Sequence, residues 1–329
     1  MSGVHGAGGQ DAGSLPAEVR HGAADGRPPG GGARRPRPGG RVRAVRLGPR
    51  SVASLVLVSA VGVMAFGWPL LAAPDSGLAH SSDAPWLFAG LLPLLIAVVV
   101  ATIADSARDA SGGTATGSGA WTPGLDAKAV AMLGVLAAAG AALRPLGGGT
   151  AGIEPMFFLM VLSGRVLGPG FGFVLGAVAM FASALLTGGV GPWMPFQMLA
   201  MGWVAMGAGL LPAARRLRGR GELLMLAGYG AVASVLYGTA MNLQGWPYLG
   251  GMAASVSFVP GDPLPDNLAR FLAYCLATSM GWDLPRAVVT VVLVLTLGGT
   301  ILRALRRATR RAAFGAPVAF AEPDRSRMR

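Results

Sequence analysis

The sequence predicts an all-α, polytopic membrane protein. Of its 329 residues, 53% are hydrophobic and only 13% are charged. The hydrophobic residues are gathered into runs of about 17–23, which is the length that a helix needs to cross a hydrocarbon core of ~30 Å. Arginine collects at the two ends of the chain, outside these runs. Long apolar runs flanked by arginine are typical of a chain that crosses a membrane several times.

The net charge of +12 comes from the two ends of the chain. Residues 1–50 contain nine Arg against three acidic residues, and residues 302–329 contain eight Arg against two, so each end carries +6. The positive-inside rule places such ends in the cytoplasm. We therefore expect both termini to be cytoplasmic, and we expect the basic ends to signal topology and contact the lipid bilayer rather than to bind nucleic acid.

Composition divides the chain into five parts. The first is rich in Pro, Gly and Arg and is predicted to be disordered. Two apolar segments, 51–73 and 85–104, follow and predict a transmembrane hairpin; a cleaved signal peptide is the alternative for the first of them. The predicted parts are a disordered cytoplasmic tail (1–50), the hairpin (51–104), a polar Gly/Ser/Thr linker (105–126), a six-helix membrane domain (127–312) and a basic cytoplasmic tail (313–329).

The larger membrane domain contains six candidate membrane helices. Turns that carry Arg alternate with turns that carry aromatic and amide side chains, which indicates alternate cytoplasmic and external turns. Because both termini are expected inside, the number of crossings should be even. We therefore interpret the short apolar piece 267–281 as an external, partly inserted helix that leads into the last span, and expect eight crossings. The six predicted helices are 128–146, 153–167, 170–187, 195–213, 222–243 and 284–304.

Small residues recur every four positions in two of these helices. Such rows let a second helix approach closely, which is how helices associate in lipid. The rows serve either packing within one bundle or docking of a partner subunit, and the pattern alone leaves both open. They are Ala127 with Ala131, then Gly134 with Ala138 and Ala142, and finally Gly168 with Gly172 and Gly176.

The residues that carry most enzyme chemistry are scarce. Cys275 is the only cysteine and the three histidines lie outside the apolar runs, so we expect no metal site and no cofactor. No phosphate-binding G-x-x-x-x-G-K-[ST] loop is present. No nucleophile has a neighbouring base, and no carboxylate lies near a predicted bilayer midplane, where ion-coupled carriers use one. We expect a protein without enzyme activity of its own.

Polar and aromatic residues collect instead in the predicted external connections, as is typical of a binding site for a small molecule. An interfacial belt of Trp and Tyr is the alternative for each aromatic residue. Glu154 has the further alternative of stabilising a helix start. Asp283 and Arg286, three residues apart, have the alternative of a local salt bridge. The candidate substrate-binding residues are Arg144, Glu154, Trp193, Phe196, Gln197, Asn242, Gln244, Trp246, Tyr248, Trp282 and Asp283.

Two stretches of the chain, 143–212 and "TSMGWDLPRAVVT" (278–290), are informative, and the first is most specific in "GRVLGPGFGFVLGA" and "GGVGPWMPFQM". Together they resemble the substrate-binding S components of energy-coupling factor (ECF) vitamin importers of an actinobacterial type. The resemblance covers about residues 127–312. It implies a six-helix S-component fold in a bacterial cytoplasmic (inner) membrane. It also implies external loops that close over a vitamin, a membrane T subunit as partner, and two ECF ATPases that supply the energy.

Family members dock on the T subunit through an Ala-x-x-x-Ala row on their first core helix. Ala127 with Ala131 matches that row, and Gly134 with Ala138 is a relaxed version of it. The resemblance favours cobalamin as the substrate and leaves riboflavin, thiamin, biotin and a queuosine precursor open. The N-terminal 126 residues have no counterpart in the family's minimal form. Three alternatives from other classes are an integral-membrane enzyme acting on a lipid or isoprenoid, a structural protein without a ligand, and a secondary carrier.

Overall fold

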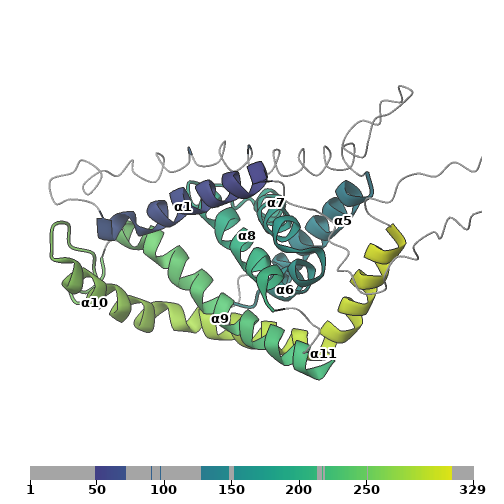
Figure 1. Ribbon diagram of the computed structural model, residues 1–329. Coiled ribbons are helices and arrows are strands. Elements are labelled where there is room, and N and C mark those ends of the chain that lie inside the picture. The colour runs from purple at the N-terminus through teal and green to yellow at the C-terminus, as the bar shows by residue number, and fades with distance from the viewer. Residues whose placement is uncertain are drawn as a thin grey trace, which may run out of the picture. The chain divides into compact units, whose positions relative to one another are not determined.

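The computed structural model describes residues 49–71, 90, 97, 127–147, 152–212, 217, 219–249 and 251–312. Chain contacts divide the protein into a unit of residues 1–41 and a unit of residues 42–329, and all the described residues belong to the second unit. Every described element is a helix (Figure 1), which confirms the predicted all-α class for this part of the chain. The predicted linker, all of the C-terminal tail and all but the last two residues of the N-terminal tail lie outside the described residues. So does the second half of the predicted hairpin, apart from residues 90 and 97.

The helices agree with most of the predicted segments. Helix α1 corresponds to the first half of the predicted hairpin, and α5 to α9 correspond to the first five predicted core helices. Short helices η1 and η2 follow α5 and α9. Their bounds are α1 (Pro49–Leu71), α5 (Ala127–Leu143), η1 (Pro145–Gly147), α6 (Met156–Leu167), α7 (Pro169–Thr187), α8 (Met194–Leu210), α9 (Arg220–Gly245) and η2 (Trp246–Tyr248).

The last part of the chain differs from the prediction. Helix α10 (Leu264–Tyr274) passes through a π-turn, η3 (Cys275–Ser279), directly into α11 (Met280–Ala312). The predicted boundary before residue 284 is therefore wrong, and Pro285 lies inside a continuous helix. Asp283 and Arg286 on either side of this proline are both buried and paired, and these contacts hold the backbone in helical geometry where proline removes one hydrogen bond.

Five helical segments in the described residues are long and apolar enough to cross a membrane, namely 52–70, 129–147, 169–187, 220–248 and 264–310. This finding supports the prediction of a membrane protein. The predicted spans 153–167 and 195–213 correspond to the shorter apolar helices α6 and α8. With 12 and 17 residues, they fall below the about 20 residues of a typical span.

Helices α7 and α8 make the most extensive contact in the bundle (Figure 1). Gly172 and Gly176, from the third predicted row of small residues, lie against the backbone of α8 at Ala205 and Met201. A Cβ atom on either glycine would overlap a carbonyl group of α8. This row therefore serves packing within the bundle, which was one of the two uses left open by the sequence.

Helix α1 packs chiefly on α8 and α9. The Trp203 indole donates a hydrogen bond of 3.0 Å to the hydroxyl of Ser59. The Phe66 ring lies edge-on to that of Phe196, with centroids 4.9 Å apart. Gly62 lies so close to Trp203 that a Cβ atom would come within 3.1 Å of its ring. The N-terminal helix is thus an integral part of the packed bundle.

Helices α9 and α11 form the second largest contact, and they run antiparallel. A row that begins on α9 and ends at the first residue of η2 faces α11 and then η3 and α10. Its members Gly230, Ser234, Gly238, Asn242 and Trp246 lie against Thr290, Arg286, Asp283, Cys275 and Phe271 in turn. The first three members of the row are small, so α11 comes close enough for Thr290 and Asp283 to lie directly over Gly230 and Gly238. This row was not recognised in the sequence, and it positions the polar residues described next.

Candidate functional site

A buried ionic cluster centres on Arg286 of α11. Its Nε donates to the carboxylate of Glu154 at 2.7 Å, and its Nη1 donates to that of Asp283 at 2.6 Å. Nη1 also lies 3.3 Å from the backbone carbonyl of Ser234 on α9. The side chain of Asp283 is 2% exposed and that of Glu154 is 24% exposed. One arginine thus joins the connection before α6 to helices α9 and α11.

Two aromatic rings complete the surroundings of Arg286. Its guanidinium carbon lies 5.3 Å from the ring centres of both Phe157 and Tyr237. These two rings are perpendicular to each other, with centroids 5.0 Å apart. A guanidinium group held by two carboxylates and two π-faces has little rotational freedom. The local salt bridge of Asp283 with Arg286, the alternative to ligand contact, is present, and Glu154 joins it.

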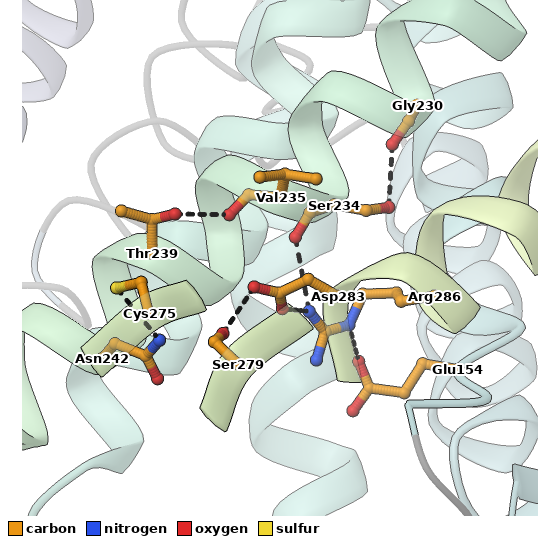
Figure 2. A network of polar contacts seen from close by, with 10 residues as sticks. All are labelled: Glu154, Gly230, Ser234, Val235, Thr239, Asn242, Cys275, Ser279, Asp283 and Arg286. Carbon is orange, nitrogen blue, oxygen red and sulfur yellow. Dashed lines mark hydrogen bonds and ion pairs between the residues drawn. The ribbon is translucent and has the colours of Figure 1, made fainter. Parts of the chain in front are cut away.

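The cluster continues as a line of polar contacts between α9 and the start of α11 (Figure 2). The Ser279 hydroxyl donates to the second carboxylate oxygen of Asp283 at 2.6 Å. One helical turn further on, the side-chain amide of Asn242 lies 3.5 Å from the sulfur of Cys275. Ser279 and Cys275 are the two ends of the π-turn η3, a type of helix irregularity that is frequent at functional sites.

Beyond this line, Trp246 lies at the centre of an aromatic cluster. It is fully buried, and its ring packs against Phe258, Phe271 and Tyr274 at centroid distances of 5.3, 5.3 and 6.5 Å. Its indole nitrogen donates to the Val256 carbonyl at 2.7 Å. Trp246 therefore fixes α10 and the loop before it onto the end of α9. Its side chain is not exposed at the surface.

The "GGVGPWMPFQM" turn divides into buried and exposed residues. Phe196 is fully buried against α1. Trp193 is 44% exposed, and its indole nitrogen donates to the Gly189 carbonyl at 3.2 Å within the same turn. Gln197 is partly buried, and its side-chain carbonyl oxygen has no hydrogen-bond partner in the described part of the chain. Of the three candidate residues in this turn, Trp193 alone is exposed, while the Gln197 oxygen is buried and unpaired among the described residues.

The remaining candidates differ in exposure and in the elements that they contact. Trp282 is 50% exposed, and its backbone carbonyl closes over Gly152, which has a positive φ of 74°. Gln244 is buried. The Tyr248 ring stacks obliquely on Trp68 of α1 at 5.8 Å. Arg144 is partly exposed at the end of α5.

A second ionic cluster, not predicted from the sequence, lies at the opposite end of α9. Glu222 accepts hydrogen bonds from Nε of Arg165 at 2.9 Å and from Nη2 of Arg306 at 2.7 Å. The side chains of Arg165 and Glu222 are 1% and 3% exposed. Arg165 also donates to the Leu211 carbonyl at 2.9 Å. The sequence contained a signal for this cluster. Arg165 and Glu222 lie in two turns that were both predicted to be cytoplasmic, so their opposite charges were expected on the same side of the membrane.

The predicted docking rows lie on α5. Ala131, Gly134, Ala138 and Ala142 are all exposed, and a Cβ atom on Gly134 would meet nothing within 4 Å. Ala127 is the first residue of the helix. The opposite face of α5, with Leu133, Ala137 and Ala141, packs into the core against α7. The small-residue face of α5 is therefore not used for packing by the described residues.

Among the described residues, no group of three His, Cys, Asp or Glu side chains could hold a metal ion. The carboxylates of Glu154 and Asp283 are both paired with Arg286. No family model matches the chain, and comparison with curated proteins and with solved structures gives no match either.

Proposed function

We propose that the chain is the substrate-capture subunit of an ATP-driven importer of a vitamin or related micronutrient, similar to the S components of ECF transporters. In this proposal the protein binds its ligand on the external face and has no enzyme activity. It then docks on a membrane T subunit whose two ATPases supply the energy. The resemblance of residues 143–212 and 278–290 to S components motivates the proposal.

The observation that carries the proposal is the network around Arg286. Glu154, Asp283 and Asn242 come from three separate connections of the sequence, and they lie along one line of polar contacts at one end of α9. Binding sites need polar groups held in fixed positions on rigid elements. The two carboxylates and two aromatic rings around Arg286 supply that rigidity here.

Exposure divides the candidate residues into two roles. Trp193, Trp282 and Glu154 retain exposed surface, so we assign ligand contact to them. Phe196 and Trp246 are fully buried, so we assign them the role of holding the surrounding helices in place. Large, partly exposed aromatic rings suit a large organic ligand, and cobalamin remains our leading substrate.

The exposed face of α5 supports a partner in the membrane. Ala131, Gly134 and Ala138 offer a surface with almost no side-chain bulk. A helix of a second protein could approach this surface closely, as small-residue rows allow in lipid. We assign this face to the T subunit, as the family resemblance implies.

Identification of the bound small molecule tests the proposal. The full chain would be expressed in a vitamin-replete bacterium, purified in mild detergent, and denatured, and the released molecules would be analysed by mass spectrometry. We expect one vitamin, with cobalamin first, at close to one molecule per chain. An identical purification from cells without the chain is the control. Recovery of no enriched small molecule, together with failure of any added vitamin to bind, would contradict the proposal.

A further inference from the structure

The end of helix α11 carries a basic surface that the proposed function does not use. Residues 287–302 are uncharged and span about 24 Å of helix, close to the thickness of a bilayer's hydrocarbon core. The helix then continues for ten more residues, to Ala312. This continuation, which we call the basic arm, contains Arg303, Arg306, Arg307, Arg310 and Arg311 and no acidic residue.

The basic arm is fixed to the bundle by one face. Leu302, Leu305 and Thr309, at helical spacing, are 3%, 8% and 3% exposed. Arg306, at the edge of that face, pairs with the buried carboxylate of Glu222. The arm is therefore held in a defined position by packing and by an ion pair.

The other face of the arm carries Arg303, Arg307 and Arg310, which are all exposed. Positions 303, 307 and 310 lie on one side of a helix, because residues four and three apart are neighbours on its surface. None of the three has an ion pair among the described residues. Glu222, the acidic residue on which the arm is fixed, already pairs with both Arg165 and Arg306. Three positive charges thus remain uncompensated on one face.

We propose that this face of the basic arm binds the headgroups of anionic phospholipids. Arg303 directly follows the uncharged stretch. The distance along the helix from Arg303 to Arg310 is about 10 Å, which is close to the depth of a headgroup layer. An anionic headgroup offers phosphate oxygens that arginine binds bidentately. Because the three arginines lie directly beyond the uncharged stretch, we favour lipid headgroups over a soluble acidic protein as their binding partner.

The experiment compares two lipids and two triple variants of the full chain. Phosphatidylglycerol and phosphatidylcholine would be titrated into the detergent-solubilised protein, and bound lipid would be counted by native mass spectrometry. The test variant is R303Q/R307Q/R310Q, which leaves Arg306 and its pair with Glu222 intact. The control variant is R325Q/R327Q/R329Q, which removes the same charge from the C-terminal tail. Melting curves of both variants check that the fold is retained.

We expect the unsubstituted chain to prefer phosphatidylglycerol, and the test variant to lose at least about tenfold in affinity for it, given the contribution of each arginine at an anionic surface. The control variant should keep the preference. Equal binding of both lipids by the unsubstituted chain, or equal losses in the two variants, would overturn the proposal. If the test variant melts at a lower temperature than the unsubstituted chain, a salt titration of the unsubstituted chain tests the proposal instead. Its preference for phosphatidylglycerol over phosphatidylcholine should fall as salt rises from about 0.05 to about 0.5 M. A preference that does not change with salt would overturn the proposal.

Discussion

At the scale of single residues, a glycine and a carboxylate show how the bundle positions its polar groups. Gly238 of α9 lies directly under the side chain of Asp283, and that carboxylate is oriented by Ser279 and Arg286. Any side chain at position 238 would occupy the space of the carboxylate. The polar network therefore depends on the absence of a side chain on the neighbouring helix.

We expect Gly238→Ala to lower the stability of the protein by about 1–3 kcal/mol, because overpacking forces Asp283 away from its partners. The matched control is Gly228→Ala on the same helix, where a Cβ atom would meet nothing within 4 Å. Alanine favours the helix over glycine, so the control should be neutral or slightly stabilising. Thermal unfolding in detergent measures both. Equal melting temperatures for the two variants would show that Asp283 does not lie over Gly238.

Glu222 carries a second prediction at this scale. Glu222→Gln would leave Arg165 charged and 1% exposed without a carboxylate partner, and we expect a loss of about 3–5 kcal/mol. Asp262→Asn is the control, because its pair with Arg270 is about a quarter to a third exposed and such pairs contribute only about 0–1 kcal/mol. Chemical unfolding of the two variants would compare these losses. A loss for Glu222→Gln no greater than for the control would contradict the buried pairing.

At the scale of elements, α1 is the clearest addition to what the sequence indicated. The family resemblance gave residues 51–73 no role, and the structure packs them on α8 and α9 through Ser59, Gly62 and Phe66. Contacts between segments about 140 residues apart leave no periodic trace in either segment. Sequence patterns predicted the helix but could not predict its neighbours.

We expect Gly62→Val to loosen α1, because the new side chain would collide with Leu199 and Trp203. The melting midpoint should fall by several degrees, about 2–4 °C for each kcal/mol in a chain of this size. Gly134→Val is the control, since that position faces open space on α5. If both variants melt together with the unsubstituted chain, α1 does not pack on α8 as described.

The α9 row shows why other elements were predictable only in part. Its members Gly230, Ser234 and Gly238 have the four-residue spacing that identified the rows on α5 and α7, so the signal was available. No comparable sequence signal showed that the helix continues through Pro285. Proline normally ends a helix, and the burial and pairing of Asp283 and Arg286 on either side of it become visible only in the structure.

At the scale of the whole molecule, two ionic clusters hold the same helices at two places. Arg286 joins the start of α6 to α9 and α11, and Glu222 on α9 joins Arg165 of α6 to Arg306 of α11. The sequence predicted the all-helical class and the apolar helices, and it left the pairing of Asp283 with Arg286 open as an alternative to ligand contact. It did not predict that Phe196 and Trp246 would be buried, because a turn sequence does not reveal which side chains face inward.

The proposed division between capture and docking gives a prediction for α5. Ala138→Leu would add bulk to the exposed small-residue face without disturbing the core. We expect uptake of the vitamin by whole cells to fall by about tenfold or more, while ligand binding by the purified protein stays unchanged, because only close helix approach is blocked. Val232→Leu, at an exposed position of α9, is the control. Loss of binding and uptake together would contradict the assignment of this face to a partner.

Equilibrium binding of cobalamin to the purified full chain tests the central claim most directly. We predict saturable binding of one molecule per chain, weakened by about tenfold or more in Trp193→Ala/Gln197→Ala, which removes the exposed ring and the buried, unpaired amide oxygen of one turn. Leu186→Ala, at an exposed apolar position nearby in the sequence, should bind as the unsubstituted chain does. Unchanged affinity in the double variant, or no binding of cobalamin or of any other vitamin, would contradict the account.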